Sequence, residues 1–326
     1  MNRRMWLATL TGLTVLLLGS GAGAQDYPTR PIRIIVPQAA GSGIDIHARL
    51  IAQKMGAILG QQAVVENRPG ANAIIGVDAV AKSAPDGYTL IYAPISSITT
   101  NGFIYKKLPY DTLRDFAPIT RTTANPLGAI ANPASGIKSL KDLVDRAKAN
   151  PGKLNYGSFG IGNMTHLMGV LLSLAADIKM THVPYRGQTP MVTDIVSGQI
   201  PMGFTTTAGV GDLVATGKLT LLATFGDKRD EQFPNVPTPT ELGYPSVVVV
   251  GWSGMLAPAG TPPQIVKKLH DAVARILAMP DVAALILKQG SKPAPNKSPE
   301  EFTAYIKSEQ AKFHPVIKAA GLENSQ

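Results

Sequence analysis

The sequence predicts an α/β protein of two domains, on three observations. Short runs of aliphatic and β-branched residues alternate with stretches whose apolar residues recur at helical spacing, which is the pattern of a largely parallel sheet covered by helices. The chain has 326 residues, a length typical of about two domains. The alternation starts again near Asn125, and the proline-rich stretch at 226–246 is typical of a chain that crosses between domains.

The first expected strand and helix frame a loop of small residues. The strand covers residues 32–37 and ends at Pro37. The loop from Gln38 to Gly43 leads into a helix that begins near Asp45 and ends at Gly60, because apolar residues recur there at helical spacing. The first cycle continues with a strand at 64–66, a helix at 74–82 and a strand at 88–93.

The second cycle repeats this alternation. A helix at 139–149 has Ser139 as its expected N-cap, and a glycine-rich loop separates the strand at 154–158 from the helix at 165–176. The other expected elements of this cycle are strands at 128–131, 183–186, 202–205 and 219–224 and a helix at 189–197. After the irregular stretch we expect a strand at 247–251 and helices at 263–278, 280–289 and 299–320.

These cycles define the expected domains. Residues 25–124 and 230–326 together form one discontinuous domain, and residues 125–229 form the other. Two crossings of the chain between the domains follow from this order. We expect the protein to be a monomer.

The first 24 residues are expected to be a signal peptide. Two arginines precede an apolar run from Leu7 to Leu18, and Ala22-Gly23-Ala24 has the small-x-small pattern that a signal peptidase accepts. The run is shorter than the roughly 20 apolar residues of a membrane span. The arginine pair is compatible with twin-arginine export as well as with general secretion. In a bacterium, the expected location of the mature protein is the periplasm.

The composition excludes several classes of function. The chain has no cysteine, which rules out disulfides, thiolate metal sites, iron–sulfur clusters, a cysteine nucleophile and a lipidated N-terminal cysteine. The net charge of +9 suggests an anionic partner, but the basic residues are spread out and are not interleaved with aromatic residues, so nucleic-acid binding has little support. The five histidines are not spaced as zinc ligands, and we expect no metal and no cofactor.

Two glycine-rich loops, at 37–45 and 157–165, each join a strand to a helix. Glycines let the backbone approach a ligand closely, and the first N–H groups of a helix have no internal partner and lie at its positive end. Ser158, Asn163 and Thr165 can add side-chain hydrogen bonds. One such loop is weak evidence, but two loops in two domains predict a cleft that clamps a carboxylate or phosphate from both sides.

Enzymatic motifs fit the sequence less well. Neither loop completes G-x-G-x-x-G, no G-x-x-x-x-G-K-[ST] is present, and residues 156–160 and 251–254 both miss the G-x-S-x-G pattern by one position. His166 is expected to pack or hydrogen-bond rather than act as a base. Asp45, in the first turn of its helix, is expected to complement the helix dipole rather than act as a general base. An exported hydrolase is therefore the weakest alternative.

At these loops the sequence resembles the periplasmic substrate-binding proteins of tripartite tricarboxylate transporters, the Bug-type family. The resemblance runs from about Tyr27 to Leu322. It implies a two-domain periplasmic-binding-protein fold of type II, a Venus flytrap with a hinge and a ligand cleft between the domains. The blocks of residues that carry it, in addition to the two loops, are Asn67–Ala71, Ala84–Leu90, Leu108–Asp111, Val183–Gly187 and Ala257–Pro262.

The resemblance also implies a function and a set of site residues. The protein would capture a small carboxylate, without catalysis, and deliver it to a membrane permease with large and small transmembrane subunits. Four hydroxyl residues that follow strands would line the cleft and contact the distal end of the ligand. They are Ser96, Ser97, Thr205 and Thr206. Carried onto this sequence, the loop residues that bind the ligand are Gln38, Ala39, Ala40, Gly41, Ser42, Gly43, Asp45, Ser158, Gly160, Gly162, Asn163 and Thr165.

Three departures from the family pattern bear on specificity. Gln38 stands where many members carry an aromatic residue, Asn163 where many carry serine, and Thr205 where some amino-acid-binding members carry aspartate. Without that aspartate, the cleft has no evident partner for an ammonium group. We therefore expect a di- or tricarboxylate or an aromatic carboxylate as the ligand. A receptor that presents its ligand to a membrane sensor kinase is an alternative that the sequence does not separate from a transport protein.

Overall fold

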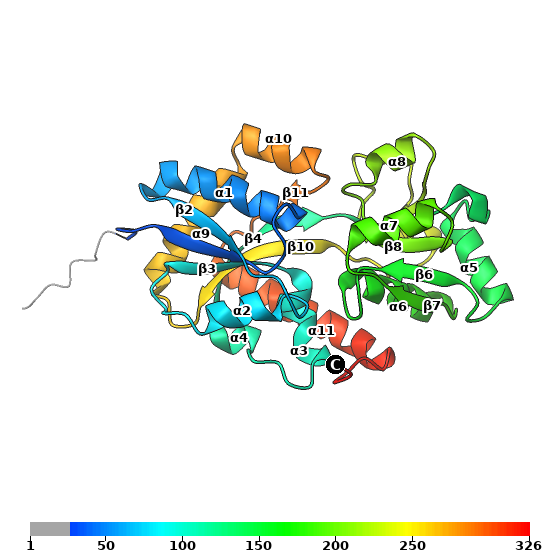
Figure 1. The fold of residues 1–326 in the computed structure, drawn as a ribbon, viewed down its shortest axis with the longest axis horizontal. Helices are drawn as coiled ribbons and strands as arrows, with labels where there is room; N and C mark the ends of the chain where they lie inside the picture. The colour runs from blue at the N-terminus through cyan, green and yellow to red at the C-terminus, as the bar shows by residue number, and fades with distance from the viewer. Residues whose placement is uncertain (1–26) are drawn as a thin grey trace, which may run out of the picture.

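The computed structural model describes residues 27–326, so the expected signal peptide lies outside the described residues. Strands and helices alternate around two separate sheets, which form the left and right halves of the molecule in Figure 1. The predicted α/β class is confirmed, but the expectation of a largely parallel sheet is wrong. Among the described residues, five of the nine strand pairings are antiparallel, because the chain enters each sheet from the other domain through strands that run against the βαβ units. No helix among the described residues is both long enough and apolar enough to span a membrane.

The first sheet has six strands in the order β11-β4-β10-β3-β1-β2. β1 pairs in parallel with β2 and β3, whereas β10 runs antiparallel between β3 and β4. Its strands are β1 (Ile32–Val36), β2 (Ala63–Asn67), β3 (Thr89–Pro94), β4 (Phe116–Asn125), β10 (Gly251–Pro258) and β11 (Lys292–Pro293). The helices of this half are α1 (Gly43–Leu59), α2 (Ile74–Ala81), the π-helical turn η1 (Ser96–Thr100), α3 (Asn101–Ile104), α4 (Thr112–Asp115), α9 (Pro263–Leu277), α10 (Pro280–Lys288) and α11 (Pro299–Ala319).

The second sheet has five strands in the order β7-β6-β8-β5-β9. β6 pairs in parallel with β7 and β8, and β5 runs antiparallel to β8 and β9. Its strands are β5 (Leu127–Ala131), β6 (Asn155–Ser158), β7 (Thr181–Pro184), β8 (Met202–Thr206) and β9 (Thr220–Thr224). Its helices are α5 (Leu140–Ala149), α6 (Met164–Ala176), α7 (Gln188–Val196) and α8 (Gly211–Ala215), with short 3₁₀ turns η2 (Pro133–Ser135) and η3 (Thr240–Leu242).

The chain passes between the two sheets twice, at neighbouring positions. β4 ends in the first sheet at Asn125, and β5 begins in the second sheet only two residues later. The return segment runs beside this crossing, because the N–H of Phe225 donates to the carbonyl of Leu127 (2.8 Å) and the N–H of Val249 donates to the carbonyl of Phe225 (2.7 Å). Two adjacent extended segments therefore link the halves.

Several strands differ from the sequence-based prediction: β11 was not predicted, β7 begins and ends two residues before the expected 183–186, and β10 and β4 differ more. The expected strand at 247–251 is wrong, because residues 247–250 form no strand and β10 runs from Gly251 to Pro258. All eight residues of β10 are buried, so this central strand lacks the alternation of apolar and polar residues that marks a strand. β4 was not predicted at all, since Pro118 interrupts it and its apolar residues (116–119) precede its polar ones (120–123) instead of alternating with them. Its pairing with β10 is irregular.

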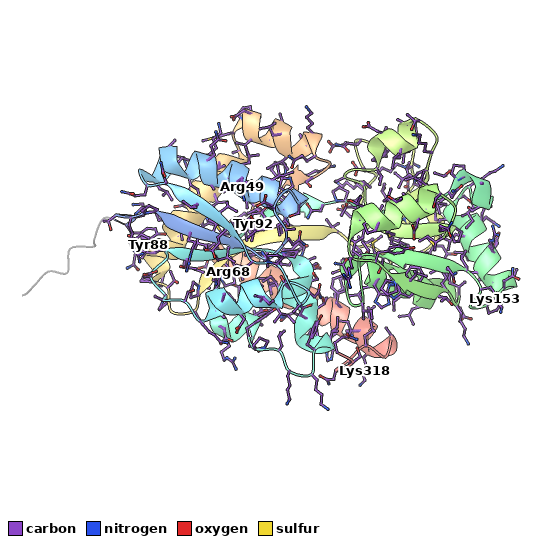
Figure 2. All side chains as sticks on the ribbon, viewed as in Figure 1. Arg49, Arg68, Tyr88, Tyr92, Lys153 and Lys318 are labelled. Atoms are coloured by element: carbon purple, nitrogen blue, oxygen red, sulfur yellow. The ribbon has the colours of Figure 1, made fainter. Side chains whose placement is uncertain are left out.

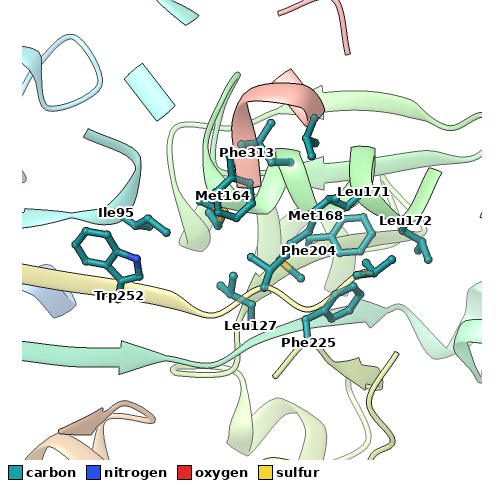
Figure 3. Close-up of a cluster of buried hydrophobic side chains, with 14 of the residues drawn as sticks. Ile95, Leu127, Met164, Met168, Leu171, Leu172, Phe204, Phe225, Trp252 and Phe313 are labelled. Atoms are coloured by element: carbon teal, nitrogen blue, oxygen red, sulfur yellow. The ribbon is translucent and has the colours of Figure 1, made fainter. Parts of the chain in front are cut away.

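One apolar cluster extends across both halves on the side of α11. Trp252 on β10 and Phe313 on α11 belong to the same cluster as Met164 on α6 and Phe204 on β8, and all four are buried (Figure 3). Burying such a side chain contributes about 1.5–3 kcal/mol. The two domains therefore share an apolar contact on this side of the molecule. A second cluster, between the first sheet and helices α1 and α9, belongs to the first half alone.

Candidate functional site

The two predicted loops lie at the carboxyl ends of parallel strands. The first loop, Gln38–Gly43, follows β1, and Ser96 and Ser97 follow the adjacent strand β3, so all of them lie at one edge of the first sheet. The second loop, Ser158–Thr165, follows β6, and Thr205 and Thr206 end the adjacent strand β8. Ligands of open α/β sheets bind at such edges.

These two edges face each other. The Thr100 hydroxyl, at the end of η1 in the first half, donates to the carbonyl of Gly162 in the second loop (3.4 Å). A Cβ atom on Gly162 would lie 2.4 Å from Cδ1 of Ile104, which shows how closely the first half approaches this loop. The structure thus brings the second loop and η1 together.

Asp45 holds the first loop in shape. Its carboxylate accepts hydrogen bonds from the N–H of Gly41 (2.8 Å), from Nδ2 of Asn67 (2.8 Å) and from Nε of Arg49 (3.0 Å). Burial alone would raise the pKa of Asp45, but the hydrogen bonds from Arg49, Gly41 and Asn67 outweigh it and hold the pKa below its usual value. Because the chain itself supplies these donors, Asp45 positions the loop.

Asn67 ties the same loop to the neighbouring strand. The parallel register of β1 and β2 sets Asn67 opposite Val36, directly before the loop begins. From there its Nδ2 also donates to the carbonyl of Gln38 (3.0 Å), and its Oδ1 accepts from Arg49 (2.9 Å), which Figure 2 shows on α1. This role of Asn67 was not predicted from the sequence, although Asn67 begins one of the blocks that carry the family resemblance.

The rest of the first loop is exposed or half-exposed to solvent. Ala39, Ala40, Gly41 and Gly43 are exposed, and Gln38 and Ser42 are half-buried. Ser42 is the N-cap of α1, where its hydroxyl accepts from the N–H of Asp45 (3.4 Å). The first N–H groups of α1 have no helical partner and carry the positive end of the helix dipole, so this loop can accept an anion.

In the second loop, Asn163 and Thr165 bond mainly to the loop itself. Oδ1 of Asn163 caps α6 by accepting from the N–H and the hydroxyl of Thr165 (both 3.1 Å). The Thr165 hydroxyl in turn accepts from the N–H of Phe159 (2.9 Å). The N–H of Gly160 donates to the Ser158 hydroxyl (3.1 Å). Hydrogen bonds within the loop therefore fix its path.

Two stacked histidines lie beneath this loop. His166 Nδ1 accepts from the N–H of Gly162 (3.1 Å), and the rings of His166 and His182 are parallel within 10°, with centroids 3.8 Å apart. Burial lowers the pKa of His166 to about 4, and burial together with the neighbouring His166 lowers the pKa of His182 to about 3. Both rings are therefore neutral near pH 7, and His166 has the hydrogen-bonding role expected from the sequence.

Ser158 and His182 have the spacing of a nucleophile and its base, with Oγ and Nε2 2.6 Å apart. Ser158 is fully buried, however, and a histidine with a pKa of about 3 is a poor base at neutral pH. Among residues 27–326, no carboxylate forms a hydrogen bond or ion pair with His182. The pair is suited to holding the end of β6 in place.

The four predicted hydroxyl residues divide into two pairs. Ser96 and Ser97 are buried in η1, where the Ser97 hydroxyl donates to the carbonyl of Pro94 (2.9 Å). Thr205 is buried, and its hydroxyl accepts from Nε2 of Gln188 (3.0 Å), while the Thr206 hydroxyl donates to Oε1 of the same Gln188 (3.3 Å). Gln188, at the start of α7, thus joins α7 to the end of β8.

A cavity of about 540 Å³ lies between the two halves. Gly43, at the start of α1, lines it and is the one member of the predicted set among its described wall residues. The polar wall residues, which include Gln188, Lys288 and Gln289, were not predicted from the sequence. The polar wall residues come from four separate segments, at 188, 207–212, 232 and 288–289, and the sequence signal for them is weak. Of the three residues named, only Gln188 lies beside a block that carries the family resemblance. Within residues 27–326, no group of three or more acidic or histidine side chains is placed to hold a metal ion.

Known proteins match this chain over most of its length. The family model described as tripartite tricarboxylate transporter family receptor matches residues 47–322. BugT of Bordetella pertussis is 33% identical over 324 residues, which cover 98% of this chain and 99% of BugT.

Two solved structures resemble the chain over most of its length. The periplasmic binding protein BugD has a TM-score of 0.79 and 32% identity, over 91% of this chain and 99% of BugD. The protein Rpa4515 of R. palustris, solved with adipate, has a TM-score of 0.82 and 30% identity, over 90% of this chain and 98% of that protein. These matches confirm the predicted two-domain periplasmic-binding-protein fold. The chain belongs to the tripartite tricarboxylate transporter receptor family, whose members include the Bug proteins.

Proposed function

We propose that the protein captures a di- or tricarboxylate, or an aromatic carboxylate, between its two domains and delivers it to a tripartite tricarboxylate-type permease. One observation carries this proposal: the loops Gln38–Gly43 and Ser158–Thr165, each at the start of a helix, lie on facing edges of the two sheets. The positive ends of α1 and α6 can hold a carboxylate through backbone N–H groups. The adipate-bound relative supports a carboxylate ligand.

The histidines and the glycine-rich loop favour binding over catalysis. Ser158 is buried, and the neutral His182 beside it is too weak a base to activate it. Backbone donors hold an anion without covalent chemistry, which suits a protein that must release its ligand unchanged. We therefore propose that the protein is not an enzyme.

The sheets also support the proposed domains. Residues 25–124 and 230–326 supply the strands of the first sheet, and residues 125–229 supply those of the second. The segment after residue 230 still contacts the second sheet, because the N–H of Thr224 donates to the carbonyl of Pro237 (3.0 Å) and the Thr207 hydroxyl donates to Asp230 (3.3 Å). We place the return crossing near Val250 rather than at Asp230.

Calorimetric titration of ligand-free protein tests the ligand class. The panel contains dicarboxylates of four to eight carbons, citrate, benzoate, glutamate and aspartate. We expect a plain carboxylate to bind more tightly than either amino acid. Glutamate or aspartate binding more tightly than every plain carboxylate would contradict the proposed ligand class, and turnover of any panel member would contradict a purely binding role.

A variant of the first loop tests whether the carboxylate binds at the proposed site. Ala40→Glu places a negative charge in the exposed part of the first loop, so it should abolish carboxylate binding while the fold persists. Ala149→Glu, at an exposed position at the end of α5, is the matched control and should bind like the wild type. Equal affinity of the Ala40→Glu variant would remove the first loop from the site.

Two cellular measurements test export and the partner. A mature N-terminus near Gln25 in the periplasmic fraction would support the proposed signal peptide and location. Deletion of the gene should abolish uptake of the ligand if the protein serves a permease. Deletion that abolishes induction by the ligand, and leaves uptake intact, would instead support the sensor-kinase alternative.

A further inference from the structure

A buried histidine supports the middle of the second loop. His166, in the first turn of α6, is buried, and its Nδ1 accepts a hydrogen bond from the N–H of Gly162 (3.1 Å). Nδ1 can accept only when the imidazole is neutral and carries its proton on Nε2. Burial lowers the pKa of His166 to about 4, so the ring is neutral near pH 7. Its Nδ1 is therefore available as an acceptor.

His182 holds the ring of His166 in this orientation. The two rings stack with centroids 3.8 Å apart, so a rotation of His166 about its side-chain bonds would break the stack. His182 is fixed in turn at the end of β6, because its Nε2 lies 2.6 Å from Oγ of Ser158. The acceptor for Gly162 thus has a fixed position in the second domain.

Most backbone N–H groups of the second loop already have acceptors within the same domain. These donors are the N–H groups of Phe159, Gly160, Gly162 and Asn163. The N–H of Ile161 has no acceptor among residues 27–326. It points away from the interior of the loop, because the carbonyl of Gly160 in the same trans peptide points inward and accepts from the N–H of Asn163 (3.2 Å). Ile161 is also exposed, so this N–H is a free donor at the surface of the loop.

The same part of the loop meets the first domain. The Thr100 hydroxyl donates to the carbonyl of Gly162, and Ile104 leaves no room for a side chain at Gly162. A displacement of Gly162 would therefore disturb this contact between the domains. It would also turn the neighbouring peptide that carries the N–H of Ile161.

We propose that His166 is a positioning residue for ligand binding: its Nδ1 holds Gly162 in place so that the N–H of Ile161 faces a bound carboxylate. This inference rests on the proposed carboxylate-binding function, and it assigns a part in that function to a residue that does not contact the ligand. Without an acceptor at this position the peptide between Ile161 and Gly162 gains freedom, and binding must then order it at a cost in free energy.

Three variants at position 166 test this role by calorimetry, with the carboxylate of the panel that the wild type binds most tightly. His166→Phe keeps a ring that can stack on His182 but removes the acceptor, so we expect about tenfold weaker binding. His166→Asn places its Oδ1 near the position of Nδ1, and it should restore the affinity to within about threefold of the wild type. His166→Gln places its Oε1 beyond that position and should bind as weakly as the phenylalanine variant. The asparagine and glutamine variants make the same comparison if the phenylalanine variant does not fold.

His270→Phe is the matched control. His270 is equally buried and its Nε2 lies 3.0 Å from a backbone carbonyl, that of Asn296, but it belongs to α9 and to neither loop. This variant should lose stability and keep the wild-type affinity.

Hydrogen exchange followed by NMR gives a second readout that a general loss of stability does not reproduce. In the ligand-free protein, the Gly162 amide should be protected in the wild type and in His166→Asn. In His166→Phe it should exchange much faster, while the core amides of α6 keep their protection relative to one another.

The outcomes separate this inference from the proposed function. If the wild type binds a carboxylate and His166→Phe binds it equally well, the role of His166 is overturned and the carboxylate function stands. If His166→Asn binds as weakly as His166→Phe, or if the Gly162 amide exchanges freely in the wild type, the acceptor is not what matters and the inference is also overturned. If the wild type binds no carboxylate of the panel, both fall.

Discussion

Gly290 lies against Ala208 across the boundary between the domains, so closely that a Cβ atom at Gly290 would be 2.6 Å from the Cα atom of Ala208. Gly290 also has a φ of +74°, a conformation that other residues adopt at a cost. Gly290→Ala should therefore hold the domains apart at this side and weaken ligand binding about tenfold.

Small-angle scattering with saturating ligand, together with calorimetry, measures this effect. Gly321→Ala is the matched control, because Gly321 has a similar φ of +65° and open space around it. The control should share the loss of stability, about 1 kcal/mol, and keep the wild-type affinity. Wild-type dimensions and affinity in Gly290→Ala would show that the contact with Ala208 does not govern closure.

Replacement of Asp45 should loosen the first loop. Asp45→Asn removes the charge that accepts from Arg49, Gly41 and Asn67, and hydrogen bonds to charged groups contribute about 1.5–3 kcal/mol each. We expect a loss of roughly 2 kcal/mol in the free energy of unfolding by urea, and weaker ligand binding. Asp145→Asn, which breaks only the exposed pair with Lys141, should cost less than about 0.5 kcal/mol. Equal losses in both variants would refute the anchoring role of Asp45.

The hydroxyl of Thr165 should affect both stability and binding. Thr165→Val leaves the N–H of Phe159 without its acceptor and breaks the bond to Asn163, so we expect a loss of about 1 kcal/mol in stability and a several-fold weaker ligand affinity. Thr165→Ser keeps the hydroxyl and should restore most of both. Chemical denaturation and calorimetry measure the two quantities. If the valine variant binds like the wild type, Thr165 does not shape the site.

The buried histidines should make the fold sensitive to mild acid. Burial lowers the pKa values of His47 and His166 to about 4 and that of His182 to about 3, against 6.5 in the unfolded chain. Below pH 6.5 the unfolded chain therefore binds more protons than the folded one, so stability is full above pH 6.5 and falls as the pH drops toward 4.

Thermal unfolding between pH 7.5 and 4.5 tests this expectation. The aspartates with shifted pKa values titrate below this range, but burial raises the pKa of Glu309 from 4.5, and this carboxyl opposes the trend of the histidines because its protonated form favours the folded state. The melting temperature is therefore measured in the Glu309→Gln variant as well as in the wild type. His182→Gln can retain a hydrogen bond to Ser158 and should reduce the slope of the melting temperature against pH. A melting temperature that stays constant over the range would contradict the buried neutral histidines.

The sequence predicted the loops better than it predicted the strands around them. Gln38–Gly43 and 157–165 were placed correctly between strand and helix, because glycines and helix caps are local signals. β4 was missed, since Pro118 interrupts it and its residues do not alternate between apolar and polar, so only pairing with β10 and β11 makes them a strand. The roles of Asn163 and Thr165 also needed the structure, because a side chain that can bind a ligand can equally bond to its own loop.

By itself the sequence determined the α/β class, the alternation of strands and helices, the two glycine-rich loops and the family resemblance. These depend on apolar spacing, on turn residues and on caps, which act over a few neighbouring residues. Only the tertiary structure decided which distant side chains meet: Asn67 beside Asp45 through the register of β1 and β2, and Lys288 and Gln188 on opposite walls of one cavity. Strand pairing and the packing of two domains bring these segments together, and neither leaves a local pattern in the chain.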